Sequence, residues 1–373
     1  MIKIVHFSDT HLGFSDLDVI NQDGINSREA DFYKAFSDVI DAIIKIKPNY
    51  IIHTGDLFHR ASPSNRAITF ALKEFKRLEH LKIPLIIIAG NHSTPKTHSS
   101  SPILEALSTI DNIYPIFLQK YEAVEFEDII FHALPHINDE RLIEQELDNI
   151  EQNISNSKKN ILMMHSSVGA YYLMHEFGEW VYPKNREYLF EKMDYVALGH
   201  WHGFGAVGKH SNVYYSGSTE RTSSSDKRDD KGYVIVELDK ELKVSHHRID
   251  LRKSLTFNID ASNYKEELEA LDKGDIKGAL VEVVIKNLDS SLSIDIKNSD
   301  IQDYFQDALY VKVKREFKQN SSELIDENIE SISLEGHFIA HIQGSIKDRV
   351  EQTRLIDKTK ELFAYIQESD SDS

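Results

Sequence analysis

Residues 50–60, YIIHTGDLFHR, join a run of β-branched and aromatic residues to a cluster of polar side chains. Four to eight such apolar residues without polar alternation are typical of a strand that is buried on both faces. Asp56 and His59 then fall where this strand should end, and ligand sites gather at that edge of an open α/β sheet. The stretch therefore predicts an α/β fold with a chemical site at the ends of its strands.

The same pattern recurs through the first 240 residues of the chain. Between several of the apolar runs lie helical patterns, one with a stripe from Phe32 to Ile44 and another over residues 64–80. The alternation predicts a layered α/β domain over residues 1–250. The other apolar runs are IKIVHFSD (2–9), PLIIIAGNH (84–92), IIFHALPH (129–136), NILMMH (160–165), DYVALGHWH (194–202) and VYYSGS (213–218).

A second, smaller α/β domain is expected over residues 251–316. Its predicted strands cover 254–260, 279–286 and 308–314, and its predicted helices cover 262–271 and 298–306. Residues 317–373 begin with a polar linker and continue into an amphipathic helical tail over 346–366. Two interpretations of this helix remain open: it packs on its own domain, or it docks on a partner protein.

Composition narrows the class of protein. The longest apolar runs reach about half of the ~20 residues that a membrane helix needs, so we expect a cytoplasmic protein with no membrane contact. The chain has no cysteine and 18 histidines, so any metal is held by histidine, carboxylate, amide or water. A net charge of −18 argues against general affinity for nucleic acid, so DNA binding would have to be local, metal-assisted or shared with a partner.

Nine potential ligands follow the predicted strands directly. On an extended segment residues i and i+2 point the same way, so each D-x-H or H-x-H pair is expected to face one site. Imidazole and carboxylate without sulfur favour manganese, iron or zinc, and the pairs suit two cations. These residues are Asp9, His11, Asp56, His59, Asn91, His92, His165, His200 and His202.

The order D-x-H, GD, GNH, H, G-H-x-H resembles the calcineurin-like metallophosphoesterase superfamily, and this resemblance implies that the α/β domain is a layered β-sandwich flanked by helices. Within it, HFSDTHLG, GDLFHR and YSGSTERTS are similar to the SbcD nucleases and to their archaeal and eukaryotic relatives, the Mre subunits of the double-strand-break repair complex. The motifs cover residues 4–222, and beyond about 250 the likeness is one of layout alone. One departure is Ser93, because the third motif commonly continues as GNHD or GNHE.

The resemblance implies a ligand set for two divalent metal ions and favours Mn²⁺ as both. One ion takes Asp9, His11, Asp56 and His202, and the other takes Asp56, Asn91, His165 and His200. Asp56 is then a bridge between cations ~3.5–4 Å apart. A neutral Asn91 oxygen completes a shell without adding negative charge.

His59 distinguishes branches of the superfamily. Its protein phosphatases typically have an acidic residue three positions after the bridging aspartate, whereas the SbcD-like nucleases have histidine there. The resemblance makes His59 and His92 catalytic, donating to the phosphate or protonating the leaving oxygen, a role worth about 10² to 10⁴ in rate. The alternative is that His59 only orients His92.

The resemblance also implies the biological setting. It implies exonuclease action on duplex ends, endonuclease action on single strands or hairpins, a homodimer, and an SbcC/Rad-type coiled-coil ATPase as partner. Residues 251–316 would form a DNA cap, and the tail would bind the ATPase. Candidate DNA contacts, each with a solvated surface as the alternative, are Arg60, Arg66, Arg221, Lys227 and Arg228.

Two other functions remain open from the sequence. The first is a phosphomonoesterase or cyclic-nucleotide phosphodiesterase on the same scaffold. The second is a non-catalytic dimeric scaffold that tethers a partner, although such a protein has no physical need for nine converging polar residues.

Overall fold

The computed structural model describes residues 1–94, 101–169, 181–223, 226, 230–289, 296–318, 342, 352–356 and 358–360. Residues 1–316 form one compact unit, and the chain from 317 onward forms another. Of the predicted helix at 346–366, residues 352–356 and 358–360 are helical, and the others lie outside the described residues.

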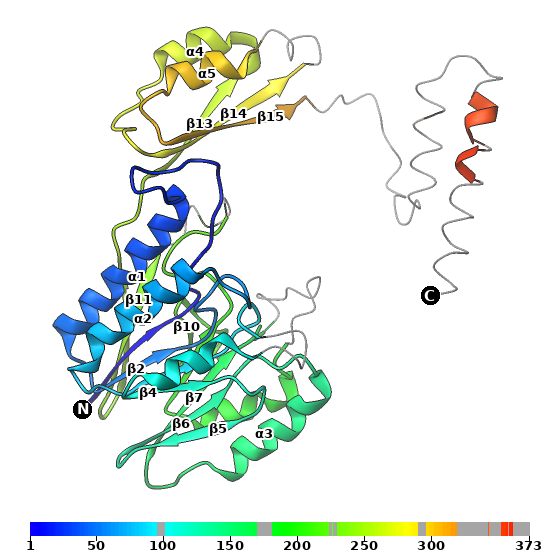
Figure 1. Ribbon diagram of the computed structural model, residues 1–373. Helices are drawn as coiled ribbons and strands as arrows, with labels where there is room; N and C mark the ends of the chain where they lie inside the picture. The colour runs from blue at the N-terminus through cyan, green and yellow to red at the C-terminus, as the bar shows by residue number, and fades with distance from the viewer. Residues whose placement is uncertain are drawn as a thin grey trace. The chain divides into compact units, whose positions relative to one another are not determined.

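The first sheet carries the N-terminal part of the chain (Figure 1). Its order is β12-β11-β1-β2-β3-β4, and the four strands from β1 to β4 run parallel to one another. The bounds are β1 Ile2–Phe7, β2 Tyr50–His53, β3 Leu85–Ile88, β4 Ile113–Ile116, β11 Gly232–Leu238 and β12 Leu242–Arg248. Strands β11 and β12 add antiparallel edges to the parallel centre.

The second sheet has the order β5-β6-β7-β8-β10-β9. Strands β6, β7, β8 and β10 are parallel, and β5 and β9 pair antiparallel at the edges. The bounds are β5 Glu122–Glu125, β6 Ile129–Leu134, β7 Lys159–His165, β8 Tyr195–Gly199, β9 Gly205–Ala206 and β10 Val213–Tyr215. Both sheets are mixed, with every one of the predicted apolar runs in a parallel strand.

Three apolar clusters hold the layers together. One contains Ile52, Phe131 and Met163 from both sheets, and it therefore lies between them. The second packs the first sheet against α1 (Ser27–Ile46) and α2 (Asn65–Glu79), and the third packs the second sheet against α3 (Ile143–Gln152). The predicted β-sandwich with flanking helices is the observed α/β architecture.

Local sequence signals set the helix ends. The Asn26 side chain accepts hydrogen bonds from the backbone N–H groups of Arg28 and Glu29, which caps α1. Ser64 caps α2 by accepting from Ala67. Short 3₁₀ helices cover Ile103–Thr109, Glu140–Leu142, Lys184–Lys192 and Ala261–Asn263.

A third, three-stranded sheet follows at residues 254–317 in the order β13-β14-β15. Its strands are β13 Ser254–Asp260, β14 Leu280–Leu288 and β15 Tyr310–Phe317, and its helices are α4 Tyr264–Ala270 and α5 Asn298–Tyr304. Val283, Ile301 and Phe305 belong to an apolar cluster confined to this segment. The segment therefore has a core of its own, as the predicted alternation of strands and helices requires.

Two properties of the fold bear on function. The carboxyl ends of β1, β2, β3, β7 and β8 carry the residues singled out from the sequence. Among the described residues, none of the helices is both long enough and apolar enough to span a membrane.

Candidate metal centre

Asp9, His11 and His202 form the first part of the centre. Each offers one ligand atom, and these atoms lie within 4.8 Å of one another. The Nε2 atoms of His11 and His202 are 3.1 Å apart. Two imidazole nitrogens that face each other at this distance are placed as two ligands of one cation are.

Neighbours set the tautomer of His202. The Thr222 hydroxyl donates to Asp226 at 3.1 Å, so it accepts from His202 Nδ1–H at 2.9 Å. Burial lowers the pKa of His202, but Asp226 outweighs burial and raises it. In the neutral ring the lone pair is then on Nε2, the atom that faces His11, and this orientation is the one that a metal ligand needs.

Asp9, Asp56 and His165 form the second part, again with ligand atoms within 4.8 Å of one another. The carbonyl of Thr54 accepts from His165 Nδ1–H at 2.8 Å. His165 Nε2 is therefore the free position, and it lies 2.8 Å from Asn91 Oδ1 and 3.3 Å from Asp56 Oδ2. Two oxygens around one nitrogen require either a proton or a cation among them.

In the metal-free chain a proton fills this position. Burial lowers the pKa of His165, but the Asp56 carboxylate outweighs burial and raises the pKa to about 9. Burial would raise the pKa of Asp56, and His165 with His11 instead holds it well below its usual range. The residues fit a divalent cation, because such an ion would replace the proton between them.

The backbone at this edge is unusual. Asp9, His11, Asp56 and His200 have φ angles of 50°, 40°, 53° and 97°, in the left-handed region that L-residues rarely adopt. The expectation that Asp9 and His11 meet because their segment is extended is therefore wrong. They meet because the loop after β1 curls left-handed and pairs with the loop after β2, through Asp9 N–H to Gly55 O and His11 N–H to Asp56 O, both 3.0 Å.

Glycines allow the close approach of these loops. A Cβ at Gly90 would lie 2.2 Å from Asp56 Oδ1, and a Cβ at Gly55 would lie 2.2 Å from His165 Nδ1. The glycines of the GD and GNH motifs thus leave space for the two ligands. Ser93, the departure from the common motif, is buried, and its hydroxyl has no hydrogen-bond partner among the described residues.

His59 and His92 lie beside the centre. Their rings stack with centroids 5.2 Å apart. The His59 carbonyl accepts from His92 Nδ1–H at 2.8 Å, and His92 N–H donates to Asp56 Oδ1 at 3.0 Å. Burial and the neighbouring His92 lower the pKa of His59 to about 4, so its ring is neutral at pH 7.

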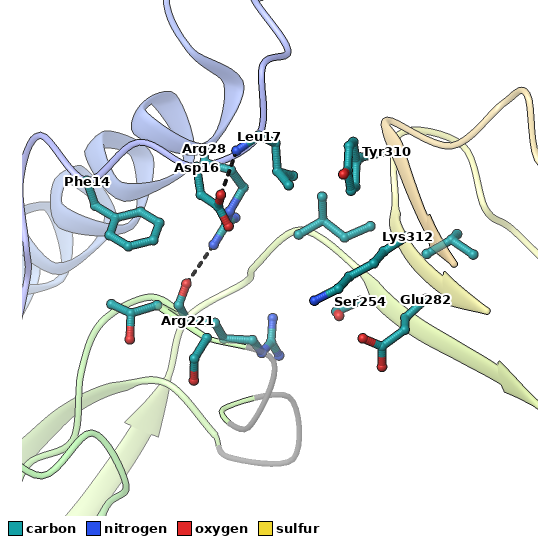
Figure 2. Close-up of a pocket in the computed structure, with 13 residues that line it drawn as sticks. Phe14, Asp16, Leu17, Arg28, Arg221, Ser254, Glu282, Tyr310 and Lys312 are labelled. Carbon is teal, nitrogen blue, oxygen red and sulfur yellow. Dashed lines mark hydrogen bonds between the residues drawn. The ribbon is translucent and has the colours of Figure 1, made fainter. Parts of the chain in front are cut away.

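The candidate DNA contacts do not gather in one place. Arg60 is exposed after β2, and Arg66 on α2 pairs with Glu29 at 3.4 Å. Arg221 lines a cavity of about 280 Å³ between the larger α/β part of the chain and the third sheet, together with Lys312 and Tyr310 (Figure 2). Lys227 and Arg228 lie outside the described residues.

The sequence analysis did not single out the supporting side chains. Thr54, Thr222 and Asp226 orient metal-facing histidines, and Ser8 donates to the Asp9 carboxylate. Lys231 donates to the His202 carbonyl at 2.7 Å. Ser8, Thr54 and Thr222 lie inside the stretches HFSDTHLG, YIIHTGDLFHR and YSGSTERTS, whereas Asp226 and Lys231 lie outside these stretches.

Comparison with known proteins places this fold and centre in a family. Residues 2–204 match the model described as calcineurin-like phosphoesterase. Relatives named "DNA double-strand break repair protein Mre11" align over most of the chain. That of Methanococcus maripaludis is 28% identical over 100% of this chain and 97% of its own length. That of Methanocaldococcus jannaschii is 30% identical over 73% of each chain, and that of Sulfolobus acidocaldarius is 27% identical over 95% of this chain and 94% of its own.

The chain thus belongs to the calcineurin-like phosphoesterase family. Within that family it is of the Mre11 type.

Proposed function

We propose that the protein is a manganese-dependent DNA nuclease of double-strand-break repair. The observation that carries this proposal is the stacked pair His59 and His92 beside a carboxylate and histidine centre suited to two cations. The relative from Methanococcus maripaludis, which matches 100% of the chain, is named as a double-strand-break repair protein. Exonuclease action on duplex ends and endonuclease action on single strands or hairpins belong to the same proposal.

The proposed ligands divide between two ions. Asp9, His11, Asp56 and His202 hold one, and Asp56, Asn91, His165 and His200 hold the other. Two such ions supply electrophilic binding of a phosphodiester oxygen and lower the pKa of coordinated water. Manganese fits the oxygen and imidazole donors, and no thiolate competes for a softer ion in a chain without cysteine.

His59 and His92 serve the phosphate. His92 is held between the Asp56 carboxylate and the His59 carbonyl, so its Nε2 is the atom that is free to work. His59 stacks on it and packs edge-on against Phe14, with ring centroids 4.9 Å apart. Both rings are thereby oriented before a substrate arrives, which is what proton transfer to a leaving oxygen requires.

DNA reaches the centre despite the charge of −18. The metals neutralise phosphate locally, and a few cations need not dominate the net charge. Arg60 beside the histidines and Arg221 with Lys312 at the cavity are the contacts that we propose. The domain of residues 251–316, which contains the third sheet, is the proposed cap over the duplex.

A substrate panel tests the activity. Linear duplex DNA, para-nitrophenyl phosphate and cyclic nucleotides are each offered with Mn²⁺, and DNA alone should be degraded efficiently. His59→Ser should lower duplex-end degradation by about 10² to 10⁴ while Mn²⁺ binding is retained. Preferential turnover of a monoester or a cyclic nucleotide would indicate a different phosphoesterase function. No turnover of any of these substrates would favour the non-catalytic scaffold.

The partners belong to the proposal as well. We expect a homodimer, measurable by sedimentation, and an SbcC/Rad-type coiled-coil ATPase that binds the tail. Leu355 and Ile356, in the helical part of the tail, are both partly exposed. Deleting residues 330–373 should abolish capture of the ATPase and leave Mn²⁺-dependent cleavage nearly unchanged. If the truncated protein still captures the ATPase, the docking site lies in another part of the chain.

A further inference from the structure

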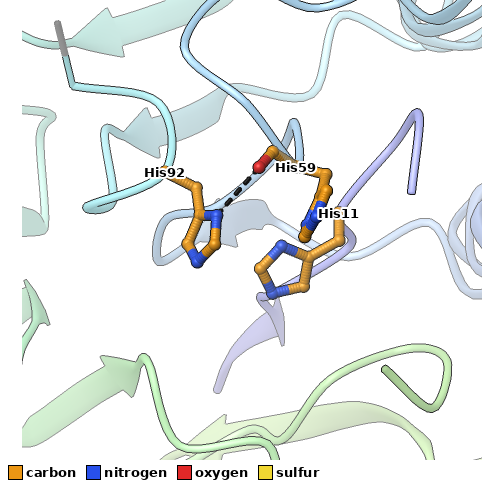
Figure 3. Close-up of side chains that lie close together, drawn as sticks. All are labelled: His11, His59 and His92. Atoms are coloured by element: carbon orange, nitrogen blue, oxygen red, sulfur yellow. Dashed lines mark hydrogen bonds between the residues drawn. The ribbon is translucent and has the colours of Figure 1, made fainter. Parts of the chain in front are cut away.

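Three histidines meet on one side of the proposed metal centre (Figure 3). His11 follows β1, His59 follows β2 and His92 follows β3, so neighbouring strands of one sheet deliver all three. The ring centroids are 5.5 Å apart for His11 and His59, 5.0 Å for His11 and His92, and 5.2 Å for His59 and His92. One ligand atom from each ring lies within 4.8 Å of the others.

Two nitrogen atoms of this cluster have no hydrogen-bond partner among the described residues. They are His11 Nδ1 and His59 Nδ1, and both are buried. His11 as a whole is only 2% exposed. The third ring donates through Nδ1 to the His59 carbonyl, so its lone pair is on Nε2. A buried nitrogen without a partner is costly, and a bound cation would satisfy it.

We propose that His11, His59 and His92 form a separate tris-imidazole site for Zn²⁺ or a similar late first-row ion. Three neutral nitrogens without a carboxylate are a donor set that zinc accepts and that manganese, which prefers oxygen, does not. Nitrogens at 2.0–2.1 Å from one tetrahedral ion are about 3.4 Å apart. Ligand atoms that already lie within 4.8 Å of one another reach that geometry by a movement on the order of 1 Å.

The site shares one ligand with the proposed dimetal centre. His11 faces His202 through Nε2 at 3.1 Å and has its unpartnered Nδ1 on the other side of the ring. A neutral imidazole has only one lone pair, so His11 binds an ion through one nitrogen or through the other. His11 can therefore serve only one of the two sites at a time, unless the neutral ring loses its remaining N–H proton and binds both ions as an imidazolate.

This exclusion has a functional consequence, which rests on the proposed nuclease function. Zinc in the tris-imidazole site would take His11 from the manganese that also needs Asp9 and His202. It would also hold both histidines that we assign to the phosphate. Zinc is therefore expected to inhibit Mn²⁺-dependent cleavage, and excess Mn²⁺ should relieve the inhibition. Zinc binding itself does not depend on the function.

Binding experiments on the full chain test the site directly. Zn²⁺ affinity is measured by competition with a chromophoric chelator for the wild type, His59→Gln and His92→Gln. Each variant should bind zinc at least tenfold more weakly, a loss of about 1.4 kcal/mol. Mn²⁺ binding should stay unchanged, which also shows that the variants are folded. The matched control is His210→Gln, because His210 pairs with Glu187 at 3.3 Å away from the cluster.

Zinc anomalous scattering from crystals of the wild type needs no variant. The expected peak lies among His11, His59 and His92. Zinc peaks confined to the Asp9 and Asp56 groups, or equal zinc affinity in all four proteins, would overturn the proposal. Inactivity of the wild type on DNA with Mn²⁺ would instead count against the nuclease assignment and would leave the binding result standing.

Discussion

At the residue scale, strain and chemistry coincide. Asp9, His11, Asp56 and His200 all have positive φ angles, and such backbone costs of order 1 to 3 kcal/mol per residue. Hydrogen bonds between the loops after β1 and β2 hold Asp9 and His11 in place. Such backbone persists where the surrounding contacts hold it in place, and here it brings the side chains of the proposed ligands close together.

Asp56 is the residue on which the two-metal proposal depends most. Asp56→Asn should abolish Mn²⁺-stimulated cleavage with the fold intact, because an amide cannot serve two cations as a carboxylate does. Manganese anomalous scattering should show two sites in the wild-type protein. A single wild-type site, or full activity of the variant, would end the two-metal account.

The raised pKa of His165 predicts opposite pH dependences for the stability of the metal-free protein and for its Mn²⁺ affinity. Its folded pKa of about 9 lies above the ordinary 6.5. In the metal-free protein, the stability that this histidine contributes is complete below pH 6.5 and is lost as the pH rises towards 9. Metal must displace the same proton, so apparent Mn²⁺ affinity should rise up to about tenfold per pH unit over this window.

Calorimetry and thermal melting, with and without Mn²⁺, measure both halves of the His165 prediction. For the stability half, Asp56→Asn is the control, because it removes the carboxylate that raises the His165 pKa. If the Mn²⁺ affinity of the wild type does not change with pH, metal binding does not displace a proton from His165.

Sequence alone was enough to locate these residues, but not to explain their geometry. Asp9, Asp56, Asn91, His165 and His200 all fall at the strand ends where the apolar runs stop. The left-handed backbone could not be predicted, since it comes from pairing between two loops. Thr222 lies inside the YSGSTERTS motif and Asp226 follows it, but only tertiary contact brings the two side chains to His202.

At the scale of elements, a buried hydrogen-bonded chain joins the two sheets. His6 of β1 bonds Tyr195 of β8 through Nδ1 and Thr54, just after β2, through Nε2, both at 2.9 Å. Burial lowers the His6 pKa to about 3, so the ring is neutral. The Thr54 carbonyl in turn accepts from His165, so this chain of contacts ends at the proposed metal centre.

Tyr195→Phe should destabilise the protein by about 1–3 kcal/mol, because it leaves His6 Nδ1 buried without a partner. Chemical denaturation measures the loss, and Mn²⁺ stoichiometry should stay at the wild-type value. The control is Tyr214→Phe, since Tyr214 stacks on the same ring with centroids 6.1 Å apart and is partly exposed. Equal effects of the two substitutions would mean that the hydroxyl of Tyr195 is unimportant.

Elements were predictable to different degrees. The parallel strands β1, β2, β3, β7 and β8 are continuous apolar runs and stand out, because both of their faces are covered. The edge strands β5 and β12 have alternating partly buried and exposed residues and could not be told from loops. Strand β9 has two residues, too few for any pattern.

At the scale of the molecule, one carboxylate ties the catalytic layers to the third sheet. Asp31 on α1 accepts from Arg252 Nε at 2.8 Å and from its Nη2 at 2.6 Å, and also from Arg28 at 2.6 Å. Arg252 lies between β12 and β13, and it donates to the Gly278 carbonyl at 2.7 Å. The contacts fix the segment that leads into the proposed DNA cap.

Asp31→Asn should therefore loosen this connection more than it disturbs either part. Asp31 is 8% exposed, and removing one partner of a buried ion pair typically costs about 3–5 kcal/mol. Hydrogen exchange and limited proteolysis should increase around residues 249–253, while β13 to β15 stay protected by their own apolar cluster. Mn²⁺ binding should not change, because Asp31 touches none of the proposed ligands.

The matched control is Asp38→Asn on the same helix, whose partner Lys34 is 63% exposed, so that pair contributes little. Unchanged exchange at 249–253 in the Asp31 variant would show that packing alone, without the ion pair, holds the third sheet in place.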